Sequence, residues 1–204
     1  MTKVDLKKEF KHLYNPSSKE VLVIDVPEMS FLMIDGVGNP NTAQEYQDAV
    51  EALYAVSYAL KFMVKKGESG IDYGVMPLEG LWWADDISQF SVDNKDIWKW
   101  TSMIMQPEYV TKGIINRAIE QARKKKQPPA LPKLRFEGFY EGLAIQIMHL
   151  GPYSAEGPTI ERLHDFIKEN GYELRGKHHE IYLTDPQRTS PEKMKIAIRQ
   201  PVRK

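Results

Sequence analysis

The sequence predicts an α+β fold in which a strand–helix–strand–strand unit occurs twice. Two apolar runs end in glycine and resemble strands, Phe31–Gly36 and Leu143–Gly151. Each run precedes a segment with helical spacing of apolar residues, and each of these segments precedes two further strand-like runs. Two such units related by a pseudo-twofold axis would enclose a central ligand cleft, which is the architecture we expect.

The first unit is defined by its helix, which we expect over residues 41–66. Thr42 and Glu45 have the spacing of a capping box, and Gly67 is typical of a residue that ends a helix. Tyr46, Val50, Leu53, Leu60 and Val64 give the apolar periodicity. Two strand-like runs then follow, at Val75–Trp83 and Trp98–Pro107.

The second unit follows the same order. After the strand at Leu143–Gly151, proline in the first turn and Gly171 at the end predict a helix over Pro158–Asn170. The closing strands are expected at His178–Leu183 and Met194–Pro201.

We therefore predict a single domain spanning residues 1–204. Repeat one covers about 19–107, a connecting helix about 107–126, and repeat two about 133–202. The segment Lys7–Tyr14 is expected to be a short arm packed on the surface.

Composition excludes several functions. The 28 Lys+Arg and 28 Asp+Glu residues cancel, and the basic run at Lys124–Lys126 most simply complements a helix dipole, so we predict no nucleic-acid partner. The apolar run 52–64 is interrupted by polar residues, and the first residues are charged, which predicts a cytoplasmic protein without a membrane partner. With no cysteine, disulfides, thiol nucleophiles and thiolate metal sites are absent.

Familiar catalytic and cofactor motifs are also absent. There is no H-E-x-x-H, G-x-S-x-G, G-K-[ST] or G-x-G-x-x-G pattern, so we predict no metal and no cofactor. His178 and His179 point to opposite faces of a strand and cannot chelate one metal ion as neighbours. His149 lies in an apolar strand and is interpreted as a hydrogen-bonded core histidine.

Strand alternation assigns side chains to faces. If Ile181 and Leu183 pack beneath helices, then His178, Glu180 and Tyr182 share the opposite face. The repeat places Glu79, Leu81 and Trp83 on the corresponding face of the first half, with Glu79 equivalent to Glu180. In the opening strands, Leu32, Ile34, Ile145 and Ile147 are expected to face the helices, and Phe31, Met33, Asp35, Gln146 and Met148 the other side.

The second face is rich in aromatic and methionine side chains with few polar groups, as small-molecule sites are. Aromatic walls stack on flat ligands and attract cations. Glu180 in this setting would act as a countercharge or as a general base, because burial raises the proton affinity of a carboxylate. An exposed glutamate on an edge strand is the alternative.

Several segments together resemble the GyrI-like small-molecule-binding domain family. They are Leu78-Glu-Gly-Leu-Trp-Trp83, Ile104-Met-Gln-Pro107, His149-Leu-Gly-Pro-Tyr-Ser154 and His179-Glu-Ile-Tyr-Leu-Thr-Asp-Pro186. The resemblance extends from about Lys19 to Val202 and is strongest to a stand-alone bacterial subgroup. It implies a duplicated strand–helix–strand–strand fold with a central cleft.

The resemblance also implies a function. Family members bind drugs and other hydrophobic, often cationic compounds, and the subgroup includes hydrolases that open the cyclopropane ring of DNA-alkylating natural products without a cofactor. Glu180 and Tyr182 match the catalytic positions. The expected ligand-binding residues are Trp82 or Trp83, Tyr109, Phe139, Tyr140 and Tyr153, in addition to Met33, Glu79 and Gln146.

Two other functions fit the same pocket. The chain could be a non-catalytic protein that sequesters xenobiotics, or it could be the effector-sensing partner of a transcription regulator. No helix-turn-helix segment precedes the domain, which disfavours a direct role in transcription.

Overall fold

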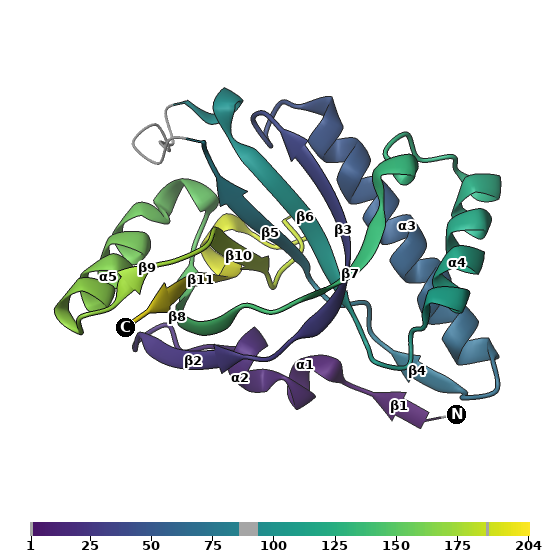
Figure 1. The fold of residues 1–204 in the computed structure, drawn as a ribbon, viewed down its shortest axis with the longest axis horizontal. Coiled ribbons are helices and arrows are strands. Elements are labelled where there is room, and N and C mark those ends of the chain that lie inside the picture. The colour runs from purple at the N-terminus through teal and green to yellow at the C-terminus, as the bar shows by residue number, and fades with distance from the viewer. Residues whose placement is uncertain (1, 86–93, 187) are drawn as a thin grey trace. The chain divides into compact units, whose positions relative to one another are not determined.

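The computed structural model describes residues 2–85, 94–186 and 188–204 and has an α+β fold (Figure 1). The chain forms two compact units. Unit 1 comprises residues 1–9, 29–78 and 82–139, and unit 2 comprises residues 10–28, 79–81 and 140–204. The chain therefore contributes an early and a central segment to unit 2 in addition to its C-terminal third.

Unit 1 is built on an antiparallel sheet in which β3 (Met29–Val37) lies between β6 (Lys99–Gln106) and β7 (Arg135–Phe139). Strand β5 (Leu78–Trp83) contributes Leu78, Trp82 and Trp83 to this unit. Strands β1 (Thr2–Val4) and β4 (Ile71–Tyr73) form a separate parallel pair. The helices are α1 (Leu6–Glu9), α3 (Gln44–Lys66) and α4 (Lys112–Lys125), and Figure 1 shows α3 and α4 side by side.

The long helix α3 covers the face of this sheet that carries Leu32 and Ile34, which is the face that the sequence predicts to lie beneath a helix. Gln106 donates to Ser57 Oγ of α3 at 3.2 Å, and cross-strand pairing places Ile104 and Leu32 on the same face as Gln106. Leu32 and Ile34 are fully buried there, which confirms their predicted orientation. The predicted capping box is wrong, because the residue preceding the helix is Ala43, which makes no side-chain cap.

Unit 2 contains antiparallel strands that pair in the order β2 (Leu22–Val26), β8 (Gly142–Leu150), β11 (Lys195–Arg203) and β10 (His178–Tyr182). Residues Glu79–Leu81 of β5 belong to this unit, and β9 (Glu173–Leu174) pairs with the end of β11. The helices are α2 (Lys11–Tyr14) and α5 (Gly157–Glu169). The short 3-10 helices of the described chain are Lys95–Ile97, Leu131–Lys133, Tyr153–Ala155 and Pro191–Lys193.

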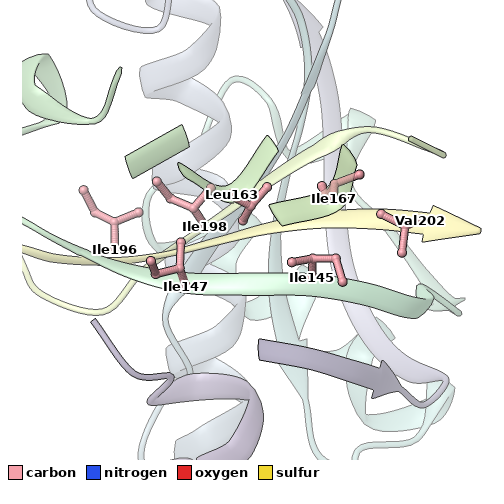
Figure 2. Close-up of a cluster of buried hydrophobic side chains, with 7 residues drawn as sticks. All are labelled: Ile145, Ile147, Leu163, Ile167, Ile196, Ile198 and Val202. Carbon is pink, nitrogen blue, oxygen red and sulfur yellow. The ribbon is translucent and has the colours of Figure 1, made fainter. Parts of the chain in front are cut away.

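Helix α5 packs on one face of the unit 2 sheet. Its residues Leu163 and Ile167 form a buried cluster with side chains of β8 and β11, namely Ile145, Ile147, Ile196, Ile198 and Val202 (Figure 2). Burial of an aliphatic side chain of this size stabilises a fold by about 1.5–3 kcal/mol. Ile145 and Ile147 therefore face a helix, as predicted.

The face predicted for β10 is wrong. Glu180 pairs with Ile198 and Tyr182 with Ile196, and directly paired residues of antiparallel strands share a face. Tyr182 packs against the cluster beneath α5. Glu180 and Tyr182 thus lie on the α5 face, whereas Ile181 lies on the opposite face with Met148.

The N-terminal segment is also different from the prediction. Leu13 and Tyr14 of α2 are buried, so this segment is part of the unit 2 core and not a surface arm. Strands β2 and β7 were not predicted. The internal duplication, the pseudo-twofold axis and the central cleft stay predictions. Within the described ranges, no helix has both the length and the apolar character of a membrane span.

Candidate functional site

The first polar cluster of unit 2 is centred on Glu180, and we call it the Glu180 cluster. Tyr182 donates its hydroxyl proton to Glu180 Oε2 at 2.8 Å, and His178 Nε2 lies 3.1 Å from Glu180 Oε1. These residues are brought together because positions 178, 180 and 182 alternate onto one face of β10. Both carboxylate oxygens of Glu180 are therefore held by a neighbouring side chain. The Glu180 side chain is 13% exposed, so the carboxylate still reaches solvent.

Aromatic and imidazole groups lie next to the partners of this carboxylate. The ring of Tyr153 packs edge-on against Tyr182, with centroids 5.8 Å apart, and Tyr153 is itself exposed. Burial lowers the pKa of His164 on α5, and the neighbouring His178 lowers it further. The cluster therefore offers a carboxylate base, a phenol donor and an aromatic surface within one unit.

The second cluster lies on the opposite face of β10 and is fully buried, and we call it the His179 network. His179 Nε2 is 2.9 Å from Glu79 Oε2, and His179 Nδ1 is 2.9 Å from Glu141 Oε1. Tyr14 donates to Glu79 Oε1 at 2.7 Å, and Arg199 donates to Glu141 Oε2 at 2.8 Å. Two carboxylates are therefore balanced by one guanidinium and by the imidazole between them.

The surroundings of His179 favour its charged form. Burial alone lowers the pKa of His179, but the charge of Glu141 and the hydrogen bonds to Glu141 and Glu79 raise it to about 9. Burial likewise raises the pKa of Glu141, yet His179 and Arg199 lower it to about 2. Burial, followed by the charge of Glu79, raises the pKa of Tyr14 well above its ordinary value. With a carboxylate at each ring nitrogen, His179 donates twice and is an imidazolium.

Glu79 and Gln146, both predicted to bind ligand, belong to the His179 network. Gln146 accepts from Arg199 Nε at 3.2 Å and donates to the His12 carbonyl at 2.6 Å. Glu79, in β5, contacts His179 and so lies beside the face of β10 that carries His179. Glu180 lies on the opposite face of β10, so the structure does not place the two glutamates on a shared face. Glu79 and Gln146 are both completely buried and satisfied by protein groups.

The predicted residues of unit 1 lie in separate packing environments. Trp82 packs between Tyr46 of α3 and Trp98, with centroid distances of 5.8 and 5.7 Å, and is part of the core. The other contacts are Met33 with Arg135, Phe139 with Phe31, and Tyr109 with Tyr73. Trp83 is partly exposed, and Tyr140, in unit 2, is 63% exposed.

The predicted catalytic pair is therefore brought together, and the ring of Tyr153, a predicted ligand-binding residue, packs against Tyr182. Sequence reasoning missed Tyr14, Glu141, His179 and Arg199. One signal was available in the sequence. His179 is a polar residue in an apolar strand, and because side chains alternate along a strand, it had to lie on the face opposite Glu180 and so indicated a second polar face. His149 is a buried core histidine, as interpreted, with Nδ1 2.9 Å from Thr159 Oγ1. Across the residues that the structure describes, no three potential metal ligands are grouped as a metal site requires.

The α+β fold is shared with a known family of small-molecule-binding domains. The GyrI-like small molecule binding domain model matches residues 19–203, and this chain belongs to that family.

Solved structures of three relatives share the fold. An uncharacterized conserved protein from Listeria innocua is 44% identical, with a TM-score of 0.90 over 98% of this chain and 100% of that one. Two structures described as hydrolases from Listeria innocua, one encoded by lin2189, are each 42% identical. Their TM-scores are 0.88 and 0.84, over 99% and 98% of this chain and 100% of theirs. A comparison with curated proteins gives no match.

Proposed function

We propose that this protein binds flat aromatic xenobiotics and hydrolyses cyclopropane-bearing DNA-alkylating compounds, which protects the cell. The observation that carries the proposal is the Glu180 cluster, in which a solvent-accessible carboxylate is held by Tyr182 and His178 beside the exposed ring of Tyr153. Membership of a small-molecule-binding family and 42% identity to two proteins described as hydrolases support it.

The protein has to lower the reaction barrier only modestly, because the strained cyclopropane ring of the substrate already favours ring opening. The oxygen of water attacks a cyclopropane carbon conjugated to a dienone, and a C–O bond forms as the ring C–C bond breaks. The electron pair of that bond moves to the carbonyl oxygen, which becomes a phenolate and takes a proton from solvent. Glu180 orients the water and accepts its proton, which it later releases to solvent.

Tyr182 has a positioning role in this scheme. Its hydroxyl occupies one oxygen of Glu180 and fixes the rotamer of the carboxylate, so that the remaining lone pairs face the water. Tyr153 supplies a face on which a flat ring stacks. Trp83, Tyr109, Phe139 and Tyr140 stay predicted ligand-binding residues, and each is tested by substitution to alanine.

The experiment is a turnover assay. Protein is incubated with a large molar excess of a cyclopropanoid, and the ring-opened water adduct is measured by mass spectrometry. Multiple turnovers that are lost in Glu180→Gln but kept in Glu169→Gln, an exposed glutamate on α5, support the proposal. Stoichiometric binding without the adduct would instead identify a protein that sequesters its ligand.

We expect turnover to be insensitive to chelators. The sequence has no cysteine and no metal-ligand motif, and the proposed roles require only a carboxylate, a phenol and water. The measurement compares the initial rate before and after extensive treatment with EDTA. A rate that falls and is restored by one divalent ion would contradict this expectation.

A further inference from the structure

Helix α3 carries aromatic side chains on its outer face as well as on its buried face. Tyr54, Tyr58 and Phe62, which we call the α3 aromatic row, are spaced by four residues and therefore lie along one side of the helix. Tyr58 and Phe62 remain 49% and 48% exposed, and the rings of Tyr54 and Tyr58 contact each other with centroids 6.3 Å apart.

The row does not contribute to the core of unit 1. The residues of α3 that are buried completely or nearly so include Leu53, Val56, Leu60 and Val64, none of which belongs to the row. Aromatic residues are enriched at protein–protein interfaces, where they supply large contact areas.

Charges are arranged symmetrically about the centre of the row. Tyr54 and Phe62 lie four residues before and after Tyr58, and Glu51 and Lys65 lie seven residues before and after it. Glu51 is 4.0 Å from Lys126 and its side chain is half exposed, while Lys65 pairs with Asp72 and stays partly exposed. Both charged groups can therefore accept a further contact at the helix surface.

We propose that the α3 aromatic row is the interface of a homodimer in which two copies of α3 pack antiparallel with Tyr58 on the twofold axis. In this arrangement Tyr54 of each copy meets Phe62 of the other, and Glu51 meets Lys65, each contact occurring twice. A parallel arrangement would instead place Glu51 against Glu51 and Lys65 against Lys65. The charge pattern thus selects a second copy and fixes its direction.

The first test uses the absence of cysteine in the chain. Helices that pack with axes about 8–10 Å apart, with Cα atoms at a radius of about 2.3 Å, bring residues on the axis to within disulfide reach. Tyr58→Cys in the full chain should form a covalent dimer under mild oxidation at least about 10-fold faster than Tyr140→Cys. Tyr140 is the matched control because it is a more exposed tyrosine far from this row in sequence.

The second test measures self-association by sedimentation equilibrium. Glu51→Lys should raise the dimer dissociation constant about 10-fold, since two attractive pairs become repulsive, and adding Lys65→Glu should restore it. The exchange leaves the net charge of the chain unchanged. A monomer at all concentrations, equal oxidation rates for the two cysteine variants, or no rescue by the double exchange would each overturn the proposal.

Discussion

At the scale of single residues, the unit 2 sheet separates two kinds of polar chemistry by alternation along β10. Glu180 and Tyr182 lie on one face and reach solvent, whereas His179 lies on the other and is enclosed. A reactive carboxylate needs contact with water, so the Glu180 cluster is the candidate for catalysis. The His179 network is fully buried, and its side chains contact one another and not solvent.

Replacement of Glu180 by glutamine separates catalysis from binding. We expect Glu180→Gln to retain most of the affinity and to lower single-turnover rates by about 10²-fold, the lower end for loss of a general base, because ring strain supplies much of the driving force. Misplacement of a reacting group alone can cost a similar factor. Trp83→Ala, which would misplace the substrate, and Tyr182→Phe, which would release the Glu180 carboxylate, should therefore be at least as slow.

The measurement is single-turnover kinetics beside dissociation constants for the three variants. If the aromatic substitutions slow ring opening no more than they weaken binding, these residues only bind the compound, and catalysis must depend on Glu180. If Glu180→Gln is as fast as the unmodified protein, the base role is wrong.

The His179 network makes stability depend on pH with a defined sign. The folded-state pKa of His179, about 9, lies above its ordinary value of 6.5, so its contribution is complete below pH 6.5 and is lost as pH rises through 9. The pKa of Glu141, about 2, lies below its ordinary 4.5, so its contribution is complete above pH 4.5 and is lost as pH falls through 2.

We therefore expect the free energy of unfolding to be maximal between about pH 4.5 and 6.5 and to decline toward pH 9. Urea titrations at a series of pH values measure this profile. The His179→Gln variant should be less stable, by about 3–5 kcal/mol for a broken buried ion pair, and should lose the alkaline decline. An unchanged alkaline slope in that variant would assign the decline to other groups.

At the scale of elements, close approach of β3 and β6 requires glycine at position 36. A Cβ atom on Gly36 would lie 2.2 Å from the indole ring of Trp100, which is fully buried and packed edge-on against Tyr46. The ring cannot move without displacing α3. The backbone conformation at position 36 is accessible to other residues, so the requirement for glycine comes from packing against Trp100 and not from the backbone.

Gly36→Ala should destabilise the protein by about 1–3 kcal/mol or more through overpacking. Gly74→Ala is the matched control, because nothing lies within 4 Å of the Cβ that it would add. The midpoints of urea unfolding for the two variants provide the comparison. Equal midpoints would show that the Trp100 ring has room to shift.

At the scale of the whole molecule, a segment of unit 2 precedes most of unit 1 in the sequence. Residues 10–28 precede β3, yet they belong with residues 140–204. Arg199 donates to the Leu13 carbonyl, and Gln146 donates to the His12 carbonyl. The region matched by the family model begins only at residue 19, so α2 extends the buried structure beyond the matched region.

A chain that begins at Lys19 should therefore be much less stable than the full chain. Truncation removes one buried hydrogen-bond partner from each of Glu79, Gln146 and Arg199, at about 1–3 kcal/mol each. Tyr14→Phe, which removes only the bond to Glu79, should cost a fraction of this. Circular dichroism during thermal unfolding measures both, and a truncated chain as stable as the full one would contradict the prediction.

The sequence by itself determined the elements whose signals are local. The helices α3 and α5 and the strands β8 and β11 follow from periodicity and terminal glycine or proline, which depend on residues close together in the chain. The pairing of Glu180 with Tyr182 followed from alternation over three residues. The family resemblance rested on short segments and was confirmed.

Only the tertiary structure decided which face of β10 a helix covers. Alternation defines two faces but does not say which one is buried beneath α5, because that depends on where the helix packs. Nor could local patterns predict the His179 network, whose contacts join Tyr14 to Glu79 across 65 positions and Leu13 to Arg199 across 186. The physical reason is that a buried charge is stabilised by neighbours in space, and chain folding alone brings these neighbours together.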